Sequence, residues 1–297
     1  MKILLFGKNG QVGWELQRSL APLGELIALD RHSVNGLCGD LSDLDALRAA
    51  IRQVKPDVVV NAAAYNSVDK AESESELADL INAQAVGVMA EEVRSLDAVL
   101  IHYSTDYVFS GRGDTPWRES DGASPLNQYG ASKLAGEQAI VASGCKHLIF
   151  RTSWVYCTRG NNFAKTMLHL AKERETLNVI ADQIGVPTGA ELIADVTAHA
   201  IVKVNQHPEL AGVYHLVAAG EVSWHGYASH VIGFAQNIGE QLRVTGIHPI
   251  DSAAYPTAAR RPLNSRMSTQ KLQENFSLRL PDWQSGVNRM LMEVFNK

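Results

Sequence analysis

The feature that most constrains the fold is a regular alternation, in the first half of the chain, of short apolar runs with longer amphipathic stretches. The runs have the length of buried strands, and the stretches between them repeat apolar residues at helical spacing. Strands are predicted over residues 3–6, 26–29, 57–61, 98–103 and 147–150, and helices over residues 12–23, 44–54, 77–93 and 129–141. Strand, helix and strand in this order build right-handed crossovers and a parallel sheet that is covered on both faces. We therefore predict an α/β fold with a doubly wound parallel sheet.

The second half of the chain is less regular, because glycine, proline and asparagine interrupt it at several points, such as Gly185-Val186-Pro187 and Tyr255-Pro256. No internal repeat, flexible linker or low-complexity segment marks a domain boundary. We expect a sheet domain over residues 1–155 and a smaller domain, mainly over residues 156–297, at the C-terminal edge of the sheet, where such folds bind substrates. The two are expected to be partly interleaved, with later segments rejoining the sheet domain.

The composition excludes several classes of protein. A chain of 297 residues with a net charge of −5 and no basic run lacks the electrostatic signature of a nucleic-acid binder. Its cysteines, Cys38, Cys145 and Cys157, show no C-x-x-C spacing, which argues against a zinc site or a disulfide framework. No apolar run approaches the roughly 20 residues of a membrane span, and the N-terminal apolar stretch is too short for a signal peptide. We therefore expect a cytoplasmic globular protein without nucleic-acid or membrane partners.

Glycines at Gly7, Gly10 and Gly13 join the first predicted strand to the first predicted helix in a G-x-x-G-x-x-G pattern. This pattern is a variant of the fingerprint with which Rossmann-like folds bind dinucleotides. Glycines allow a tight turn and let backbone N–H groups, here with Gln11 and Val12 in the motif, approach a pyrophosphate at the helix N-terminus. An ordinary glycine-rich turn is the alternative, but the position between a strand and a helix favours an NAD(P)-binding, Rossmann-like domain.

Asp30 and Arg31 at the end of the second predicted strand argue for opposite cofactors. A carboxylate there accepts hydrogen bonds from the adenosine ribose hydroxyls and repels a 2′-phosphate. The guanidinium of Arg31 is suited to pair with that phosphate. We therefore expect use of both NADH and NADPH, with a surface turn of solvated charges as the alternative.

Tyr129 and Lys133 form a Y-x-x-x-K pair inside a predicted helix. Residues four apart share a helical face, so the phenol and the ammonium can converge on one site. The lysine is expected to lower the pKa of the Tyr129 phenol, which is then suited to give a proton to a carbonyl oxygen. Taken alone the pattern is common, and a solvated helix face is the alternative.

Ser104 and Thr105 follow the fourth predicted strand, where sites in parallel sheets lie. Either hydroxyl could polarise a substrate carbonyl, and strand-end capping is the alternative for both. The residues themselves do not decide between the two hydroxyls.

The glycine pattern, Ser104-Thr105-Asp106, Tyr129 and Lys133 together resemble the extended short-chain dehydrogenase/reductase family. Further segments resemble the members of that family that reduce nucleotide-linked 4-keto sugars, and the likeness spans nearly the whole chain. These segments are Val68-Asp69-Lys70-Ala71-Glu72, Arg151-Thr152-Ser153-Trp154-Val155-Tyr156, Pro187-Thr188-Gly189 and Arg260-Arg261-Pro262-Leu263-Asn264-Ser265.

The resemblance implies reduction of the 4-keto group of dTDP-4-dehydro-β-L-rhamnose to dTDP-L-rhamnose, with hydride from NADPH or NADH, for cell-surface polysaccharide. It makes Thr105 the hydroxyl of a Thr-Tyr-Lys triad and Tyr129 the proton donor. Lys133 would hold the nicotinamide ribose and tune Tyr129. Further cofactor contacts are implied at Asp40, Leu41, Ala62, Ala63, Ala64, Tyr65 and Tyr103, and sugar-nucleotide contacts at Thr105, Asp106, Trp154 and Arg261. Trp154 could equally belong to the core.

Some bacterial relatives bind Mg²⁺ through glutamates at a dimer interface, and the matching residues are Glu15, Glu191 and Glu293. The resemblance thus implies a homodimer with a bound Mg²⁺, for which carboxylates are suitable ligands. Their spacing alone is no metal signature, and from the residues alone they are surface charges.

The chain departs from the pattern of these relatives at a few positions. Asn9 stands where Thr is frequent, Tyr65 where His is frequent, and Gly-Ala-Ser separates Tyr129 from Lys133 where Gly-Glu-Thr is frequent. None of these changes removes a catalytic group, but the role of Tyr65 stays open.

Two other functions remain as alternatives. An epimerase would share the fold and keep its NAD, whereas a 4,6-dehydratase is disfavoured because Tyr107, and not Glu, follows Thr105 and Asp106. A non-catalytic nucleotide-sensing subunit on the same scaffold is the alternative from another class. The intact Thr105, Tyr129 and Lys133 argue against it.

Overall fold

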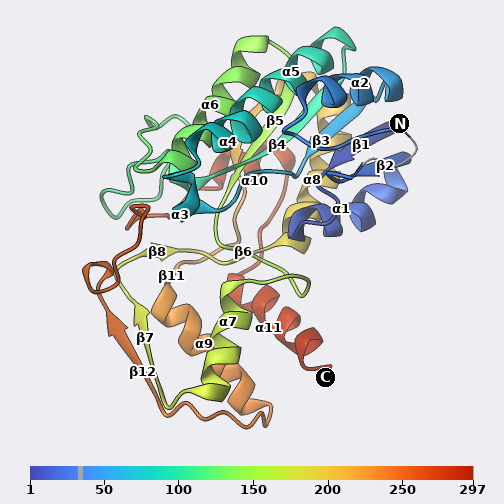
Figure 1. The fold of residues 1–297 in the computed structure, drawn as a ribbon. Helices are drawn as coiled ribbons and strands as arrows, with labels where there is room; N and C mark the ends of the chain where they lie inside the picture. Colours follow the sequence, from blue (N-terminus) through green and yellow to red (C-terminus); the bar gives the residue numbers. More distant parts are fainter. Residues whose placement is uncertain (33–35, 297) are drawn as a thin grey trace.

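The structure is a computed structural model that describes residues 1–32 and 36–296, and its centre is a parallel sheet (Figure 1). Within these residues the sheet has six strands, in the order β2 (Glu25–Leu29), β1 (Lys2–Phe6), β3 (Val58–Asn61), β4 (Val99–Thr105), β5 (Lys146–Thr152) and β10 (Gly212–His215). The chain leaves β1 first toward β2 and then toward β3, so the direction of winding changes between β1 and β3. Ligands of such sheets bind beyond the strand ends at this switch point. The predicted doubly wound α/β fold is confirmed.

Helices cover both faces of the sheet, as Figure 1 shows. One face carries α2 (Leu44–Val54), α5 (Ala85–Ser95) and α6 (Gln128–Ser143), and the other α1 (Gln11–Leu20), α8 (Ala190–Gln206) and α10 (Gln270–Phe276). Each face buries its own apolar cluster, because alternate residues of every strand point to opposite faces. None of the helices in the described part of the chain combines the length and the apolar character needed to cross a membrane.

The helix predicted over residues 77–93 is interrupted. The structure has α4 (Ser75–Asp79), a π-helical turn (Leu80–Gln84) and then α5. Such turns are often found at functional sites. Here the turn contains Asn82, whose buried amide binds the backbone of Tyr65, at 2.9 Å and 3.1 Å, and the Ser132 hydroxyl of α6. Hydrophobic periodicity could not reveal this turn, because the turn places Asn82 against two segments that are distant in the sequence, the loop at Tyr65 and helix α6.

The rest of the second half forms a lower lobe with apolar clusters of its own (Figure 1). It contains α7 (Phe163–Glu173), α9 (Trp224–Asn237), α11 (Trp283–Val294) and the strand pair β7 (Thr176–Ile180) and β12 (Gly246–Ile250). The short elements elsewhere are α3 (Val68–Ala71), β6 (Val155–Tyr156), β8 (Ile184–Gly185), β9 (Thr188–Gly189), β11 (Val222–Ser223) and single 3-10 turns at Ala21–Leu23, Asp106–Val108, Pro208–Leu210 and Ser252–Ala254. Strand β10 extends the sheet, α8 packs on α1 and α10 packs on β10 and α8, so three segments of the second half lie with the first. The domain boundary at residue 155 stays a prediction.

Candidate active site

The glycine turn after β1 packs directly on the loop after β3. Gly7 has a φ of +86°, and a Cβ there would lie 2.7 Å from the backbone carbonyl carbon of Ala62. A Cβ at Gly13 would collide with the carbonyl oxygen of Gly7. Both positions therefore require glycine for reasons internal to the fold, as a tight turn and a close helix contact demand.

Gly10 is different, because the nearest atom to a Cβ built there is the Gly7 oxygen, at an ordinary 3.4 Å. It is the residue before α1, and no side chain caps that end of the helix. The first backbone N–H groups of a helix have no partners within the helix, and together with the helix dipole they favour an anion. The N-terminus of α1 is therefore open, and Gly10 beside it is not required by packing within the protein. Both observations fit a bound diphosphate. Gln11 and Val12 are the first two residues of this turn.

Asp30, just after β2, lies within contact distance of the glycine turn. Its carboxylate accepts hydrogen bonds from the backbone N–H of His32 at 2.8 Å and from the amide of Asn9 at 2.7 Å, and Lys8 lies 3.5 Å away. These contacts, the His32 bond foremost, hold the pKa of Asp30 below its usual value. Arg31 is exposed. The structure thus places an ionised carboxylate and an exposed guanidinium side by side, as the sequence suggested, without deciding which binds the ribose.

Two further loops were predicted to contact the cofactor. Leu41 is 4% exposed and packs in the core, so only its backbone is available to a ligand, while Asp40 accepts hydrogen bonds from Ser42. Residues 62–64 (Ala62, Ala63 and Ala64) follow β3 and are partly buried. The Tyr65 hydroxyl donates to Glu74 at 2.5 Å, and this bond raises the pKa of Tyr65 to about 12.

The side chains of Thr105, Asp106 and Tyr129 meet at the carboxyl end of β4. The Thr105 hydroxyl donates to Oδ1 of Asp106 at 3.1 Å and accepts the backbone N–H of Tyr107 at 3.2 Å. The Thr105 hydroxyl also lies against the Tyr129 phenol, whose pKa burial and the charge of Asp106 raise to about 12 and the Thr105 contact lowers in part. Burial raises the pKa of Asp106 to about 6, although the hydroxyls of Ser265 and Thr105 lower it. Thr105 rather than Ser104 therefore lies at the centre, since the Ser104 hydroxyl has no hydrogen-bond partner in the described residues.

Helix α6 begins where it does because Asn127 caps it. The Asn127 side chain accepts the N–H of Gly130 at 2.8 Å and donates to the carbonyl of Arg260 at 2.7 Å. A Cβ at Gly130 would collide with the carbonyl oxygen of Tyr107. The small residue after Tyr129 thus brings the first turn of α6 against the segment after β4, and Tyr129 against Thr105.

Lys133 is buried one turn further along α6. Its Nζ atom donates to the carbonyl of Tyr103 at 2.6 Å and lies 3.2 Å from Nε2 of His102. Burial lowers the pKa of Lys133 to about 8, and the charge of Glu137 raises it. The Tyr103 side chain, by contrast, lies in the core on the other face of the sheet and bonds Thr197 at 2.8 Å, so a cofactor contact through its ring is not supported.

The sequence predicted that Lys133 lowers the pKa of Tyr129. In the structure burial and the charge of Asp106 raise that pKa to about 12, and the prediction is wrong for the protein without a cofactor. The reason is that the Lys133 nitrogen is engaged with Tyr103 and His102, whereas Tyr129 is desolvated beside a carboxyl group.

The predicted substrate residues lie around this cluster. Arg261 makes a two-pronged contact with Asp69, at 2.7 Å and 3.1 Å, so a diphosphate would have to share or displace this carboxylate. Trp154 has a φ of +47° and stacks on Trp224 with ring centroids 3.5 Å apart. It is partly buried at the edge of the lower cluster, with Gly185 leaving room for its ring.

Sequence reasoning missed Asp69, Trp224, Asn61 and His102 as neighbours of the site. Asp69 stood in a segment noted only for its resemblance, and no motif in the sequence singled out Trp224. The useful signal was the presence of Asn61 and His102 in otherwise apolar strands, because buried polar residues need partners.

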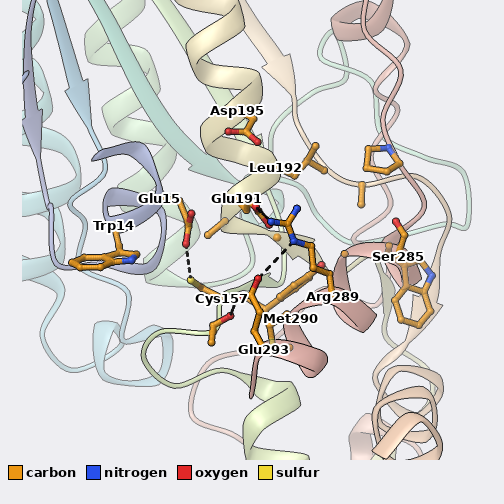
Figure 2. A pocket seen from close by; sticks show the side chains of 18 of the residues that line it. Trp14, Glu15, Cys157, Glu191, Leu192, Asp195, Ser285, Arg289, Met290 and Glu293 are labelled. Atoms are coloured by element: carbon orange, nitrogen blue, oxygen red, sulfur yellow. Dashed lines mark hydrogen bonds and ion pairs between the residues drawn. The ribbon is translucent and has the colours of Figure 1, made fainter. Parts of the chain in front are cut away.

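The predicted metal ligands Glu15, Glu191 and Glu293 line one pocket of about 700 Å³ between α1, α8 and α11 (Figure 2). Two of them already face Arg289, at 2.8 Å from Glu191 and 3.6 Å from Glu293, and Glu15 faces Arg18 at 3.4 Å. No group of His, Cys, Asp and Glu in residues 1–32 and 36–296 is arranged to hold a metal ion. These carboxylates do not fit a Mg²⁺ site within one chain, and we assign no step to the metal.

Comparison with known proteins places this site in a family. Residues 1–296 match the family described as the RmlD substrate binding domain. The relative "dTDP-4-dehydrorhamnose reductase" of Shigella flexneri is 59% identical over 295 residues, which cover 99% of this chain and 98% of the relative. The protein of the same name in Escherichia coli K12 is 58% identical over 295 residues, covering 99% of this chain and 98% of that one.

Solved structures give the same result. A dTDP-4-dehydrorhamnose reductase of Bacillus anthracis, solved in complex with NADP, has a TM-score of 0.87 and 34% identity over 99% of this chain and 100% of that one. A UDP-glucose 4-epimerase of Thermus thermophilus, with a TM-score of 0.80, 20% identity and coverage of 100% of this chain and 99% of that one, shares the fold alone. The turn after β1, the hydroxyl after β4 and the Tyr-Lys helix thus occur in a chain that belongs to the RmlD substrate binding domain family.

Proposed function

We propose that this chain reduces the 4-keto group of dTDP-4-dehydro-β-L-rhamnose to dTDP-L-rhamnose with a hydride from NAD(P)H. The observation that carries the proposal is that Thr105 and Tyr129 lie together at the carboxyl end of β4, with Lys133 buried one helical turn beyond Tyr129, in a sheet whose switch point holds an uncapped helix N-terminus. The high identity to reductases of that name supports the choice of sugar nucleotide.

Tyr129 is suited to deliver the proton. Because burial keeps its pKa at about 12, the phenol stays protonated at neutral pH and has a proton to give. Thr105 lies against the phenol and can turn its own hydroxyl from Asp106 toward a carbonyl oxygen. When bound, the nicotinamide cofactor supplies the hydride.

Several residues fit the cofactor. The open first turn of α1 after Gly10 would hold the diphosphate, and Lys133 the nicotinamide ribose. Asp30 favours NADH and Arg31 favours NADPH, so we propose that the chain uses both. The assignment of Trp154 and Arg261 to the sugar nucleotide is part of the same proposal.

The direct test mixes the purified chain and NADPH with a panel of nucleotide-linked 4-keto sugars and follows the loss of reduced nicotinamide. We expect turnover with dTDP-4-dehydro-β-L-rhamnose and a dTDP-L-rhamnose product. Epimerised product without net nicotinamide consumption would favour an epimerase. Binding of nucleotide without turnover of any sugar would favour a sensing subunit.

The homodimer and the cytoplasmic location stay predictions. Sedimentation equilibrium tests the first, and a mass of one chain at micromolar concentration would contradict it. The same measurement with a chelator tests whether any divalent cation contributes to assembly.

A further inference from the structure

His102 is a buried titratable residue that the proposed mechanism does not use. It lies in β4 on the face covered by α5 and α6, is 1% exposed, and both of its ring nitrogens have neighbours. Nδ1 lies 3.2 Å from the amide nitrogen of Asn61 on β3, and Nε2 lies 3.2 Å from Nζ of Lys133 on α6. The ring therefore links a buried amide to a member of the triad.

The orientation of the Asn61 amide is fixed by its other contact. The backbone N–H of Ala63 lies 3.1 Å from Oδ1 of Asn61. A backbone N–H can only donate, so the amide atom that it contacts must be the oxygen. The NH₂ group of Asn61 consequently faces His102.

This orientation sets the tautomer of the ring. Because an amide NH₂ can only donate, Nδ1 of His102 must be the unprotonated acceptor. The single proton of a neutral imidazole is then on Nε2 and points at Nζ of Lys133. An ammonium group has three donors and no acceptor. If Lys133 were charged, one of its N–H groups would point at the N–H of His102, and the two donors would repel each other. A neutral amine has a lone pair for this N–H and two hydrogens, one of which serves the Tyr103 carbonyl.

We propose that Asn61 and His102 form a fixed-tautomer pair that presents an N–H donor to Lys133 and so disfavours the charged form of its side chain in the protein without cofactor. His102 is thus a positioning residue, which acts through Lys133. This inference rests on the proposed function only in that Lys133 belongs to the triad.

The charges around Lys133 do not cancel this effect. On its own helix, Glu137 is the anion that acts on it, and Arg151 of β5 neutralises Glu137 through contacts of 3.0 Å and 2.6 Å. Tyr129, one turn earlier, stays a neutral phenol. Burial lowers the pKa of Lys133 to about 8 against the opposing charge of Glu137, and the facing N–H acts in the same direction as burial. The ring itself does not take up a second proton, because burial above all holds the pKa of His102 well below its ordinary value.

The test measures the cofactor-free protein by NMR. The ¹⁵N shifts of labelled histidine distinguish a protonated from an unprotonated ring nitrogen, and His102→Gln identifies the resonances by their loss. We expect an unprotonated Nδ1 and a protonated Nε2. A ring protonated at Nδ1, or at both nitrogens, at neutral pH would overturn the proposal. The ¹³Cε shift of Lys133 should in addition titrate with a pKa below about 9, against the ordinary 10.5, and a higher value would contradict us.

Asn61→Asp should reverse the pair. A carboxylate can accept from Ala63 and from Nδ1–H at the same time, so the proton of His102 moves to Nδ1 and Nε2 becomes an acceptor for an ammonium. We expect the reversed tautomer and a Lys133 pKa raised by about one pH unit or more. An unchanged tautomer in this variant would contradict the proposal, and if the variant does not fold, the wild-type spectrum alone decides.

Asn82→Asp is the matched control. Asn82 is equally buried and binds Ser132 of α6 at 3.0 Å. This change adds a buried carboxylate in the same layer but leaves Asn61 in place, so the tautomer of His102 should stay as in the wild type; a reversal there would show that charge alone sets it. These NMR measurements use neither cofactor nor sugar. Their outcome is therefore independent of the assay of sugar reduction.

Discussion

The turn after β1 and the cluster after β4 are built in contrasting ways. The turn offers backbone N–H groups, and two of its glycines are required by close backbone contacts, Gly13 with Gly7 and Gly7 with Ala62. The cluster is built of side chains from separate elements, and burial moves their pKa values in opposite directions, to about 12 for Tyr129 and about 8 for Lys133. A binding site made of backbone can be recognised from a local pattern, whereas the protonation states of a cluster depend on what the whole fold places around it.

The largest effect should come from the cluster. Tyr129→Phe removes the proton that the carbonyl oxygen needs, so we expect turnover to fall by about 10³-fold. NADPH affinity, measured by fluorescence titration, should change little, since the glycine turn is intact. Full activity in this variant would overturn the proposed role, and loss of binding would show that the two regions are not separable.

A pair of glycine variants tests the turn. Gly13→Ala forces a methyl group against the Gly7 carbonyl, so we expect the free energy of unfolding to fall by about 2 kcal/mol, as for other overpacked sites. Gly10→Ala has 3.4 Å of room and should leave the stability nearly unchanged while NADPH binds about tenfold more weakly, the equivalent of 1.4 kcal/mol. Denaturant unfolding and titration of each variant measure both quantities. Equal losses of stability would contradict the distinction between the two glycines.

Asp106 tests the effect of burial on the cluster. Its carboxyl has a pKa of about 6 in the folded chain against 3.8 for the free group, so the folded state binds more protons between these values and its stability falls as the pH rises through them. Asp106→Asn lacks this loss. From pH 4 to pH 7 the stability of the variant relative to the wild type should therefore rise by about 2 kcal/mol in urea unfolding. A difference that is independent of pH would mean that the carboxyl is not desolvated.

The smallest effects concern cofactor choice beside the turn. Asp30→Ala should shift the ratio of kcat/KM toward NADPH, and Arg31→Ala toward NADH, each by a few-fold because both groups are near solvent. Steady-state rates with the two cofactors measure the ratio. If neither variant changes it, these residues do not contact the ribose or its phosphate.

Five of the six strands of the sheet were predicted to within a few residues, because their apolar runs are long enough to bury on both faces, whereas β10 was not predicted. The helix over residues 77–93 was predicted as continuous, yet it contains a π-helical turn that serves Tyr65 and Ser132. Local pattern could not reveal that need. The pairing of Arg261 with Asp69 was equally hidden, since the two residues are 192 positions apart in the chain.

The sequence by itself determined the order of strands and helices in the first half of the chain, the glycine turn, and the pairing of Tyr129 with Lys133 on one helix. Each of these follows from spacing over a few residues, which backbone geometry converts into structure directly, whereas the choice of Thr105 came from a resemblance to known proteins. Only the tertiary structure decided that Leu41 and the Tyr103 ring belong to the core. It also decided that the glutamates of the pocket between α1, α8 and α11 face arginines. It also decided which way the proton of His102 points and that Tyr129 is a weaker acid than a free phenol. Desolvation and hydrogen-bond direction depend on all the groups that surround an atom, and these are brought together only when the chain is folded.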